Sequence, residues 1–505
     1  MKDEEKGEGR RNETSVLLSS SFILFFILHP SSFILHPFLP NHFQLACVSH
    51  CGGWMMQQLC AFLLCGMTLV GATSAQNPDE SRALAVDKLF EPVNDKTPGA
   101  AVVVIRDGAV VLKKAYGMAD VTAGVPNTTK TRFLLASVTK TFTAAAIMQL
   151  ADRGLLNIDD TVSKYLTDFP SGDKVKLRHL LTHTGGLPDF MSYEQAREKP
   201  LEFEPGTRVS YSNIGYQMLG KIIEKVSGQT YEAYLQENIF KPAGMSSSGV
   251  DKESSLKERA CGYLNSPDGF QSAGRNAATD AYAAGSLFSS VEDLFLWSQA
   301  LESGKLVKTE TLQQVFTPTR MNDGRDGVFG LGWMIGRNKG LREVHHGGDI
   351  TGFNTEVARY PDQKFTVIVL SNIGMRPLGP LPNAADLSKK IAEIYLGDQM
   401  KEEPEVKIVK LDSAVLDLYV GEYAIEAPEV VLREGGRTFV ITHEGDRLMG
   451  ESKMGKGELL AESETVFQAK GSPVKLTFIK DPDGKVNRVL FSVMGVREFP
   501  AHRIK

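Results

Sequence analysis

The stretch that decides the fold runs Leu134-Leu135-Ala136-Ser137-Val138-Thr139-Lys140 and continues without a single charge over residues 141–151. An uncharged segment of this length predicts a helix that is buried on all sides. Ser137 and Lys140 stand three positions apart at its start, so they share one face. Desolvation lowers the pKa of a lysine, and a neutral amine can deprotonate a neighbouring hydroxyl. The stretch therefore indicates a nucleophile, Ser137, with Lys140 as its base.

The Ser-x-x-Lys pattern is not unique to this stretch, since it also begins at Ser171, Ser254 and Ser472. Those three serines lie in a turn, in a charged segment and in a strand-rich region, whereas Ser137 begins an uncharged helix. An alternative is that Ser137 only caps the helix and Lys140 extends to solvent, because serine is a common N-cap. The stretch alone leaves both interpretations open.

A second candidate is Tyr211-Ser212-Asn213, which precedes an amphipathic segment. A tyrosine beside an ammonium has its phenolate favoured, so Tyr211 could shuttle a proton, and Asn213 can donate to a substrate carbonyl. The alternative is a tyrosine in a turn, with Asn213 capping the next helix. A similar pair occurs at Tyr263 and Asn265.

A third candidate is His345-His346-Gly347-Gly348-Asp349. Two glycines let a strand approach a ligand closely, and a backbone N–H just after them can form part of an oxyanion hole. The histidine pair suggests a metal as an alternative. Neighbouring side chains on a strand point to opposite faces, so we expect neither a metal nor any other cofactor.

The order of elements predicts an α+β fold. β-rich segments near both ends of the body enclose helical segments, which favours an antiparallel sheet with flanking helices and a helical region beside it. The expected strands are residues 100–105, 109–112, 332–335, 354–360 and 365–371, and the expected helices are residues 141–151, 213–226, 291–301 and 384–395.

The pattern changes after residue 398. A charged linker, 399–410, precedes short alternating strands with turn signals, which predict a small all-β barrel or sandwich over 411–505. This segment carries no group of catalytic residue types, so we expect it to be accessory, with the catalytic domain spanning residues 76–398.

The N-terminal part differs from the rest. Residues 1–54 are of low complexity and read as disordered or as translated upstream sequence. The apolar run 59–70, followed by small residues up to Ala75, predicts a signal peptide over 55–75 and an exported, periplasmic or secreted protein. A retained membrane anchor is the alternative. Four of the five cysteines precede residue 76, which leaves Cys261 and no disulfide framework.

The net charge gives no indication of a nucleic-acid partner. The formal net charge of the 505 residues is only −5, which offers no basic field for nucleic acid. We therefore expect a small-molecule or peptide substrate, and membrane association only if the apolar N-terminal segment is retained.

Taken in order, Ser137-Val138-Thr139-Lys140, Tyr211-Ser212-Asn213 and His346-Gly347-Gly348 resemble the three motifs of class C β-lactamases and their relatives, which are D-alanyl-D-alanine carboxypeptidases, D-aminopeptidases and β-lactamase-like esterases. Further stretches are similar to landmarks of this penicillin-binding-protein-like superfamily, and these are residues 180–188, 284–290 and 329–333. Residues 419–423, Tyr-Val-Gly-Glu-Tyr, resemble the start of the lipocalin-like domains often appended to such proteins.

The resemblance implies a serine hydrolase that forms an acyl-enzyme at Ser137 on a small ester, amide or D-amino-acid peptide. It implies substrate binding by Asn213, His346 and Gly348, and an oxyanion hole from the backbone N–H groups of Ser137 and Asp349. Many β-lactamases of the superfamily have Lys-Thr-Gly where this chain has His346-Gly347-Gly348. Histidine is mostly neutral near pH 7, so it lacks the fixed charge that attracts the carboxylate of a β-lactam.

Two alternatives remain besides a peptidase or esterase. One is a true class C-like β-lactamase, and the other is a non-catalytic protein of the same fold that binds cell-wall peptides. The complete set of Ser137, Lys140 and Tyr211 favours an enzyme, since a scaffold needs none of them.

Overall fold

The computed structural model describes residues 78–505 apart from short stretches, which are residues 170, 190–191, 267–268, 275–276, 375–380, 402–407, 428–431, 433–435, 454, 473, 494 and 496. The predicted extension 1–54 and the predicted signal peptide 55–75 lie outside the described residues, as do residues 402–407 of the predicted linker. In the described part, no helix combines the length and the apolar character needed to cross a membrane.

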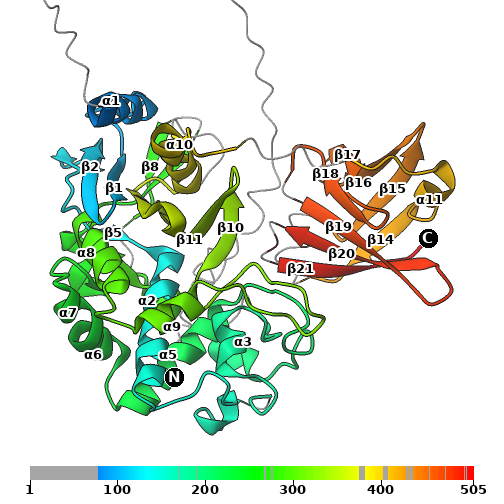
Figure 1. Cartoon of the computed structure of the whole chain (residues 1–505), viewed down its shortest axis with the longest axis horizontal. Coiled ribbons are helices and arrows are strands. Elements are labelled where there is room, and N and C mark those ends of the chain that lie inside the picture. The colour runs from blue at the N-terminus through cyan, green and yellow to red at the C-terminus, as the bar shows by residue number, and fades with distance from the viewer. Residues whose placement is uncertain are drawn as a thin grey trace, which may run out of the picture.

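The centre of the N-terminal part is an antiparallel sheet built from both ends of that part of the chain (Figure 1). Its order is β10-β11-β12-β13-β1-β2. The strands are β1 (Ala100–Arg106), β2 (Ala109–Tyr116), β10 (Met334–Asn338), β11 (Leu341–Ile350), β12 (Phe353–Tyr360) and β13 (Phe365–Ser371). β1 pairs with β13, with Ala100 opposite Ser371, so strands from the two ends of this part of the chain are neighbours inside the sheet.

The inner strands β1, β12 and β13 are buried on both faces, which explains why β1 is a continuous Ala-Ala-Val-Val-Val-Ile run. Val103 and Ile105 face one core and Val102 and Val104 face another, as the period of two along a strand requires. Helices α1 (Pro78–Leu89) and α10 (Ala384–Leu396) cover the second of these faces.

The first face packs on α8 (Val291–Glu302) and on a helical region around α2 (Thr139–Asp152) and α5 (Asn213–Ser227) (Figure 1). The other helices of this part are α3 (Leu177–Leu181), α4 (Tyr193–Ala196), α6 (Tyr231–Leu235), α7 (Lys241–Ala243) and α9 (Thr309–Val315). As predicted, α2 is buried almost throughout.

Short strands join these elements outside the main sheet. They are β3 (Met118–Asp120) with β4 (Val125–Pro126), β5 (Phe133–Leu134) with β9 (Leu287–Ser289) and β6 (Gly249–Val250), and β7 (Tyr263–Ser266) with β8 (Gly269–Ser272). The β5–β9 pair holds the chain just before Ser137 beside residues 287–289.

The strand predicted at residues 332–335 begins later than expected, at Met334. Gly332 has a φ of +83° and lies against α2, where a Cβ would stand 2.5 Å from that of Ala144. Gly332 therefore serves a close contact with α2 and is not part of the strand.

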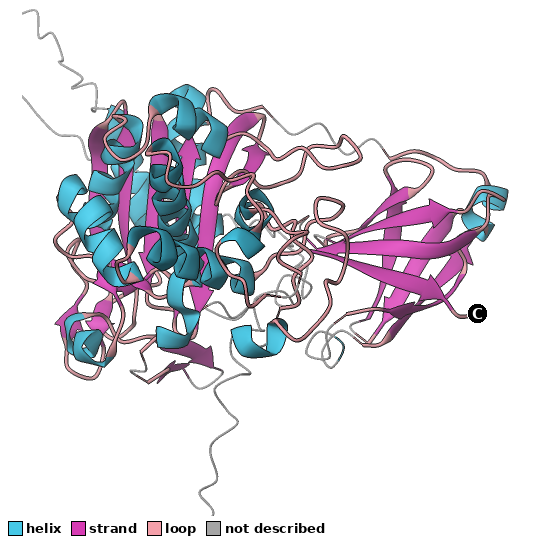
Figure 2. Cartoon of the chain, turned by 90° about the horizontal axis from the view of Figure 1, so that it is seen from below, coloured by secondary structure: helices cyan, strands magenta, loops and turns pink. Residues whose placement is uncertain are grey.

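The C-terminal part is a closed, all-antiparallel barrel in which each strand pairs with the next and the last pairs with the first (Figure 2). A short helix, α11 (Ser413–Asp417), precedes it. The strands are β14 (Gly421–Ile425), β15 (Thr438–Glu444), β16 (Arg447–Ser452), β17 (Gly455–Ala461), β18 (Val466–Ala469), β19 (Val474–Lys480), β20 (Val486–Val493) and β21 (Arg497–Arg503). The predicted fold class, an α+β region followed by a small lipocalin-like barrel, is confirmed.

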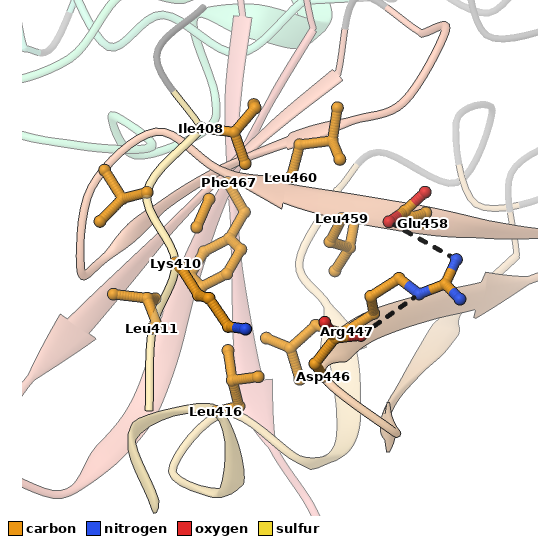
Figure 3. A pocket seen from close by; sticks show the side chains of 13 residues that line it. Ile408, Lys410, Leu411, Leu416, Asp446, Arg447, Glu458, Leu459, Leu460 and Phe467 are labelled. Carbon is orange, nitrogen blue, oxygen red and sulfur yellow. Dashed lines mark ion pairs between the residues drawn. The ribbon is translucent and has the colours of Figure 1, made fainter. Parts of the chain in front are cut away.

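A cavity of about 390 Å³ lies on this barrel, between residues 408–411 and strands β16 and β17 (Figure 3). Leucines and Phe467 form much of its wall, and Arg447 stands at one side with Glu458 3.9 Å away. Its lining includes no serine, cysteine, threonine or histidine. The cavity therefore offers no hydroxyl, thiol or imidazole, and the candidate serine lies elsewhere.

Candidate active site

Ser137 lies in a single 3-10 turn, η4 (Ala136–Val138), which leads into α2. Ala136 before it has a φ of +47°, a left-handed conformation that costs energy for a residue other than glycine. The N-cap of α2 is Val138, and no side chain caps the 3-10 turn η4 or the helix α2. The alternative that Ser137 is merely a helix cap is therefore wrong, and its half-buried hydroxyl is left for other contacts.

Lys140 is fully buried, and its Nζ has three oxygen neighbours. They are Ser137 Oγ at 3.2 Å, Asn213 Oδ1 at 2.9 Å and the carbonyl oxygen of Ala284 at 2.7 Å. Burial lowers the pKa of Lys140 from 10.5 to about 7, and the negative charge of Asp189 opposes this shift. A neutral Lys140 can donate to Asn213 and Ala284 and still direct its lone pair at the hydroxyl of Ser137.

Tyr211 lies beside this pair, with its ring 4.8 Å from Lys140 Nζ. Burial raises the pKa of Tyr211 above its ordinary value, and a hydrogen bond with Ser137 offsets only part of that effect. The expectation that Lys140 would favour the phenolate is therefore wrong, because desolvation dominates. Tyr211 is present as a phenol, which can donate a proton but does not accept one at rest.

Asn213 is the first residue of α5, yet it does not cap that helix. The cap is Ser212, whose Oγ accepts from the backbone N–H of Gly215 at 3.1 Å. This leaves the side chain of Asn213 to accept from Lys140, so the capping alternative for Asn213 is wrong.

His183 is a residue of this site to which the sequence reasoning gave no role. Its Nδ1 accepts from the backbone N–H of Ser212 at 3.0 Å, and its ring stacks on that of Tyr211 with centroids 4.2 Å apart. Burial and the nearby charge of Lys140 lower the pKa of His183, so the ring is neutral. Its signal was the Thr182-His183-Thr184-Gly185-Gly186 stretch, which is part of residues 180–188 and is similar to a landmark of the superfamily.

Strand β11 brings the third motif to Ser137. Gly348 packs against the backbone of Leu135, two residues before the serine. The hydroxyl of Thr355, on the neighbouring strand β12, donates to the carbonyl of Leu135 at 2.9 Å and so joins the sheet to the same segment. Asp349 follows in β11, half-buried and opposite Asn354.

His346 is buried, and its Nδ1 donates to the carbonyl of Gly347 at 2.7 Å. That bond leaves Nε2 as an acceptor, and this atom has no partner among the described residues. Burial, with Lys140 nearby, lowers the pKa of His346 to about 3, so the ring is uncharged at neutral pH. His345 makes a separate contact, with Glu356 2.9 Å away, so the two histidines do not share a ligand.

The other Ser-x-x-Lys pairs lie away from this cluster. Ser254 is exposed, and Ser171 and Ser472 are half-buried, while their lysines, Lys257, Lys174 and Lys475, are all exposed. None of these lysines has the desolvation that acts on Lys140. Tyr263 likewise lies elsewhere, with its hydroxyl accepting from the backbone N–H of Val121 at 2.8 Å.

The structure also places one residue of the barrel at the site. Arg497, in β21, is buried and donates to Asp189 and to the carbonyl of Tyr211. The C-terminal domain, which we expected to be accessory, thus contributes one buried side chain beside Tyr211. Nothing in the sequence near Arg497 pointed to this contact.

Comparison with known proteins agrees with the geometry. The sequence profile of the Beta-lactamase family matches residues 86–388. Penicillin-binding protein 4* of Bacillus subtilis (strain 168) is 31% identical over 442 residues, which cover 80% of this chain and 95% of that protein. The D-aminopeptidase of Brucella anthropi is 28% identical over 343 residues, which cover 64% of this chain and 63% of that protein.

Among solved structures, the octameric penicillin-binding protein homologue from Pyrococcus abyssi is similar, with a TM-score of 0.55 and 27% identity. The match covers 84% of this chain and 99% of that one. The predicted resemblance is confirmed. With the family profile matching more than half of the residues and the Bacillus subtilis protein aligned over nearly its whole length, this chain belongs to the β-lactamase family.

Proposed function

We propose that the protein is a serine hydrolase that forms an acyl-enzyme at Ser137 on a small ester, amide or D-amino-acid peptide. The observation that carries the proposal is the buried Lys140, whose Nζ lies 3.2 Å from Ser137 Oγ and whose pKa is lowered to about 7. A neutral amine at hydrogen-bond distance from a hydroxyl is the arrangement that a general base requires.

In the proposed reaction, Lys140 takes the proton of Ser137 while Oγ forms a bond to the substrate carbonyl carbon. The backbone N–H groups of Ser137 and Asp349 stabilise the resulting oxyanion. Tyr211, which is protonated at rest, gives its proton to the leaving group, and the ammonium of Lys140 restores it. Water then hydrolyses the ester at Ser137 by the reverse sequence of proton transfers.

The third motif favours substrates without a carboxylate next to the reacting carbonyl. His346 is neutral, so it provides no fixed charge for the carboxylate of a β-lactam. Its Nε2 instead offers an acceptor to a substrate N–H or O–H group. The same site in a dedicated β-lactamase would need another cation, so we place an esterase or a peptidase ahead of that alternative.

Labelling of the full chain with a fluorophosphonate tests the proposal, followed by mass spectrometry of the labelled peptide. We expect one adduct, on Ser137, and turnover of at least one of p-nitrophenyl acetate, D-alanyl-p-nitroanilide and nitrocefin. Ser137→Ala should lose both, with an unchanged melting temperature, because the hydroxyl caps no helix. Ser171→Ala and Ser254→Ala are matched controls and should label like wild type. A wild-type protein without an adduct on Ser137 would favour the non-catalytic, peptide-binding alternative.

We also propose that the protein is exported, on the strength of the apolar run 59–70 and the small residues that follow it. N-terminal sequencing of the secreted protein should give a start near Gln76. An abundant cellular form that keeps residues 1–54 would contradict this.

A further inference from the structure

The barrel meets the catalytic part at the start of β21, at the end of the barrel that faces that part (Figure 1). At this contact, β21 pairs with a segment of the catalytic part. Arg497 pairs with Ser210 as an antiparallel bridge, and the backbone N–H of Glu498 donates to the carbonyl of Val209 at 3.3 Å. Residues 209–210 lead directly into Tyr211, so the last strand of the barrel lies alongside the segment that carries this motif.

The side chain of Arg497 continues this contact below the surface. Only 2% of it is exposed, and its Nη2 donates to Asp189 Oδ2 at 3.0 Å and to the carbonyl oxygen of Tyr211. Asp189 is equally buried, with 5% of its side chain exposed. A buried charge requires a partner, so each of the two depends on the other.

The second oxygen of Asp189 completes a bridge across the motif. Oδ1 accepts from the backbone N–H of Asn213 at 3.2 Å, which is the first N–H of α5, where a negative charge is favourable. Arg497 therefore holds the carbonyl end of Tyr211 directly, and it holds the amide end of Asn213 through Asp189. His183 holds the residue between them, at the N–H of Ser212.

The consequence reaches the nucleophile through Lys140. Its Nζ lies 2.9 Å from Asn213 Oδ1 and beneath the ring of Tyr211, so a shift of this segment changes the surroundings of the base. The Arg497–Asp189 pair also affects the electrostatic potential at Lys140. Asp189 favours the ammonium form of Lys140, and the guanidinium of Arg497, 3.0 Å from Asp189 Oδ2, carries the opposite charge.

We propose that Arg497, on the C-terminal barrel, is a positioning residue for acylation: together with Asp189 it fixes the Tyr211–Asn213 segment against Ser137 and Lys140. The inference rests on the proposed function, since it assigns a role within the same reaction. It makes the barrel a part of the active enzyme rather than an appendage.

The experiment compares full-length wild type with Arg497→Met, Arg497→Lys and the uncharged pair Arg497→Met/Asp189→Asn. The readouts are kcat and KM for a p-nitrophenyl ester from pH 5 to pH 9, the rate of fluorophosphonate labelling and the melting temperature. Arg447→Met, which removes an exposed arginine from the same barrel, is the matched control and should leave every readout unchanged.

We expect Arg497→Met to lower kcat and the labelling rate at least tenfold, because it moves the Tyr211–Asn213 segment relative to Ser137 and Lys140. The acid limb of its pH profile should move to higher pH, since Asp189 then acts on Lys140 without its counter-charge. In the double variant that displacement should disappear while kcat stays low. The other charged or titratable groups facing Lys140 are Tyr211, Tyr216, His183 and His346, and none of them is changed in these variants.

Arg497→Lys, which keeps the charge, should recover a substantial part of kcat. If Arg497→Met does not fold, the lysine variant and the double variant decide: a folded double variant with wild-type kcat overturns the proposal. So does a folded Arg497→Met with wild-type kcat and an unmoved acid limb, while Ser137 still labels in wild type. A wild-type protein that never labels at Ser137 rejects the proposed function, and this role of Arg497 with it.

Discussion

Gly348 packs directly on the main chain that carries Ser137. A Cβ on Gly348 would lie 2.1 Å from the carbonyl oxygen of Leu135, 2.4 Å from Thr355 Oγ1 and 3.1 Å from the backbone nitrogen of Ser137. No side chain fits in that space without moving β11 or the turn before α2. The glycine is thus required by the close approach of two backbones, and this approach sets the distance between Ser137 and Asp349.

Gly348→Ala should separate β11 from Ser137 and so widen the proposed oxyanion hole. Loss of one oxyanion donor costs about 10²–10³-fold in kcat, and we expect a decrease in this range. Steady-state kinetics with a p-nitrophenyl ester measure it, and the melting temperature should fall as well. Gly336→Ala in β10 is the matched control, because a Cβ there meets nothing within 4 Å. Equal activity of the two variants would show that the close approach does not matter.

The pH profile should report Lys140. Its pKa is lowered to about 7, and only the neutral amine can accept the proton of Ser137. Below that pH the ammonium has no lone pair, so kcat/KM for an ester should rise with pH along a limb with an apparent pKa near 7. Lys140→Arg, which cannot become neutral, should be inactive throughout, whereas Lys257→Arg should match wild type. A flat profile between pH 5 and pH 8 would exclude Lys140 as the base.

Tyr211→Phe should keep the stacking on His183 and lose only the hydroxyl beside Ser137. Loss of a general acid or base lowers the rate by roughly 10²–10⁴-fold, so we expect a decrease of this order in turnover. Folding should be unaffected, which circular dichroism and thermal melting can check. Tyr234→Phe in α6 changes a tyrosine outside the site and should keep full activity. Wild-type turnover in Tyr211→Phe would leave Lys140 to carry both proton transfers.

His346→Lys should change selectivity more than overall rate. A lysine at this position supplies the positive charge that the neutral histidine lacks, so acylation by carboxylate-bearing β-lactams should increase relative to neutral esters. The ratio of nitrocefin to p-nitrophenyl acetate turnover is the measurement. His346→Gln, which stays neutral, should leave the ratio unchanged. If the lysine variant behaves like the glutamine variant, charge at this position does not determine the preference.

The local parts of the site could be predicted from the sequence, because their signals lie within a few residues. The absence of charge over residues 141–151 identified α2, and the three-residue spacing placed Ser137 and Lys140 on one face. The glycines at 347–348 indicated the close approach of a strand. In each case a single element carries both the pattern and its consequence.

The parts that could not be predicted depend on elements far apart in the chain. Asp189 and Arg497 are separated by 308 positions, and each is an ordinary charged residue in its own surroundings. The acceptor at Ala284 is a backbone carbonyl, which every residue has, so no residue type marks it. The pKa of Tyr211 was predicted with the wrong sign because adjacency to Lys140 is visible in the motifs, whereas burial depends on the whole fold.

The pairing of β1 with β13 has a consequence for the order in which the molecule can form. β1 is synthesised early, yet one of its two neighbours in the sheet, β13, ends at Ser371. Until the ribosome has passed that point, β1 has only β2 as a partner, and a lone hairpin of two strands is marginally stable in water. Long-range pairing of this kind is slow to form, since the intervening chain must close first. A nascent chain thus remains without its central sheet for most of its synthesis, which is the state in which an unfolded polypeptide can still be threaded through a narrow channel.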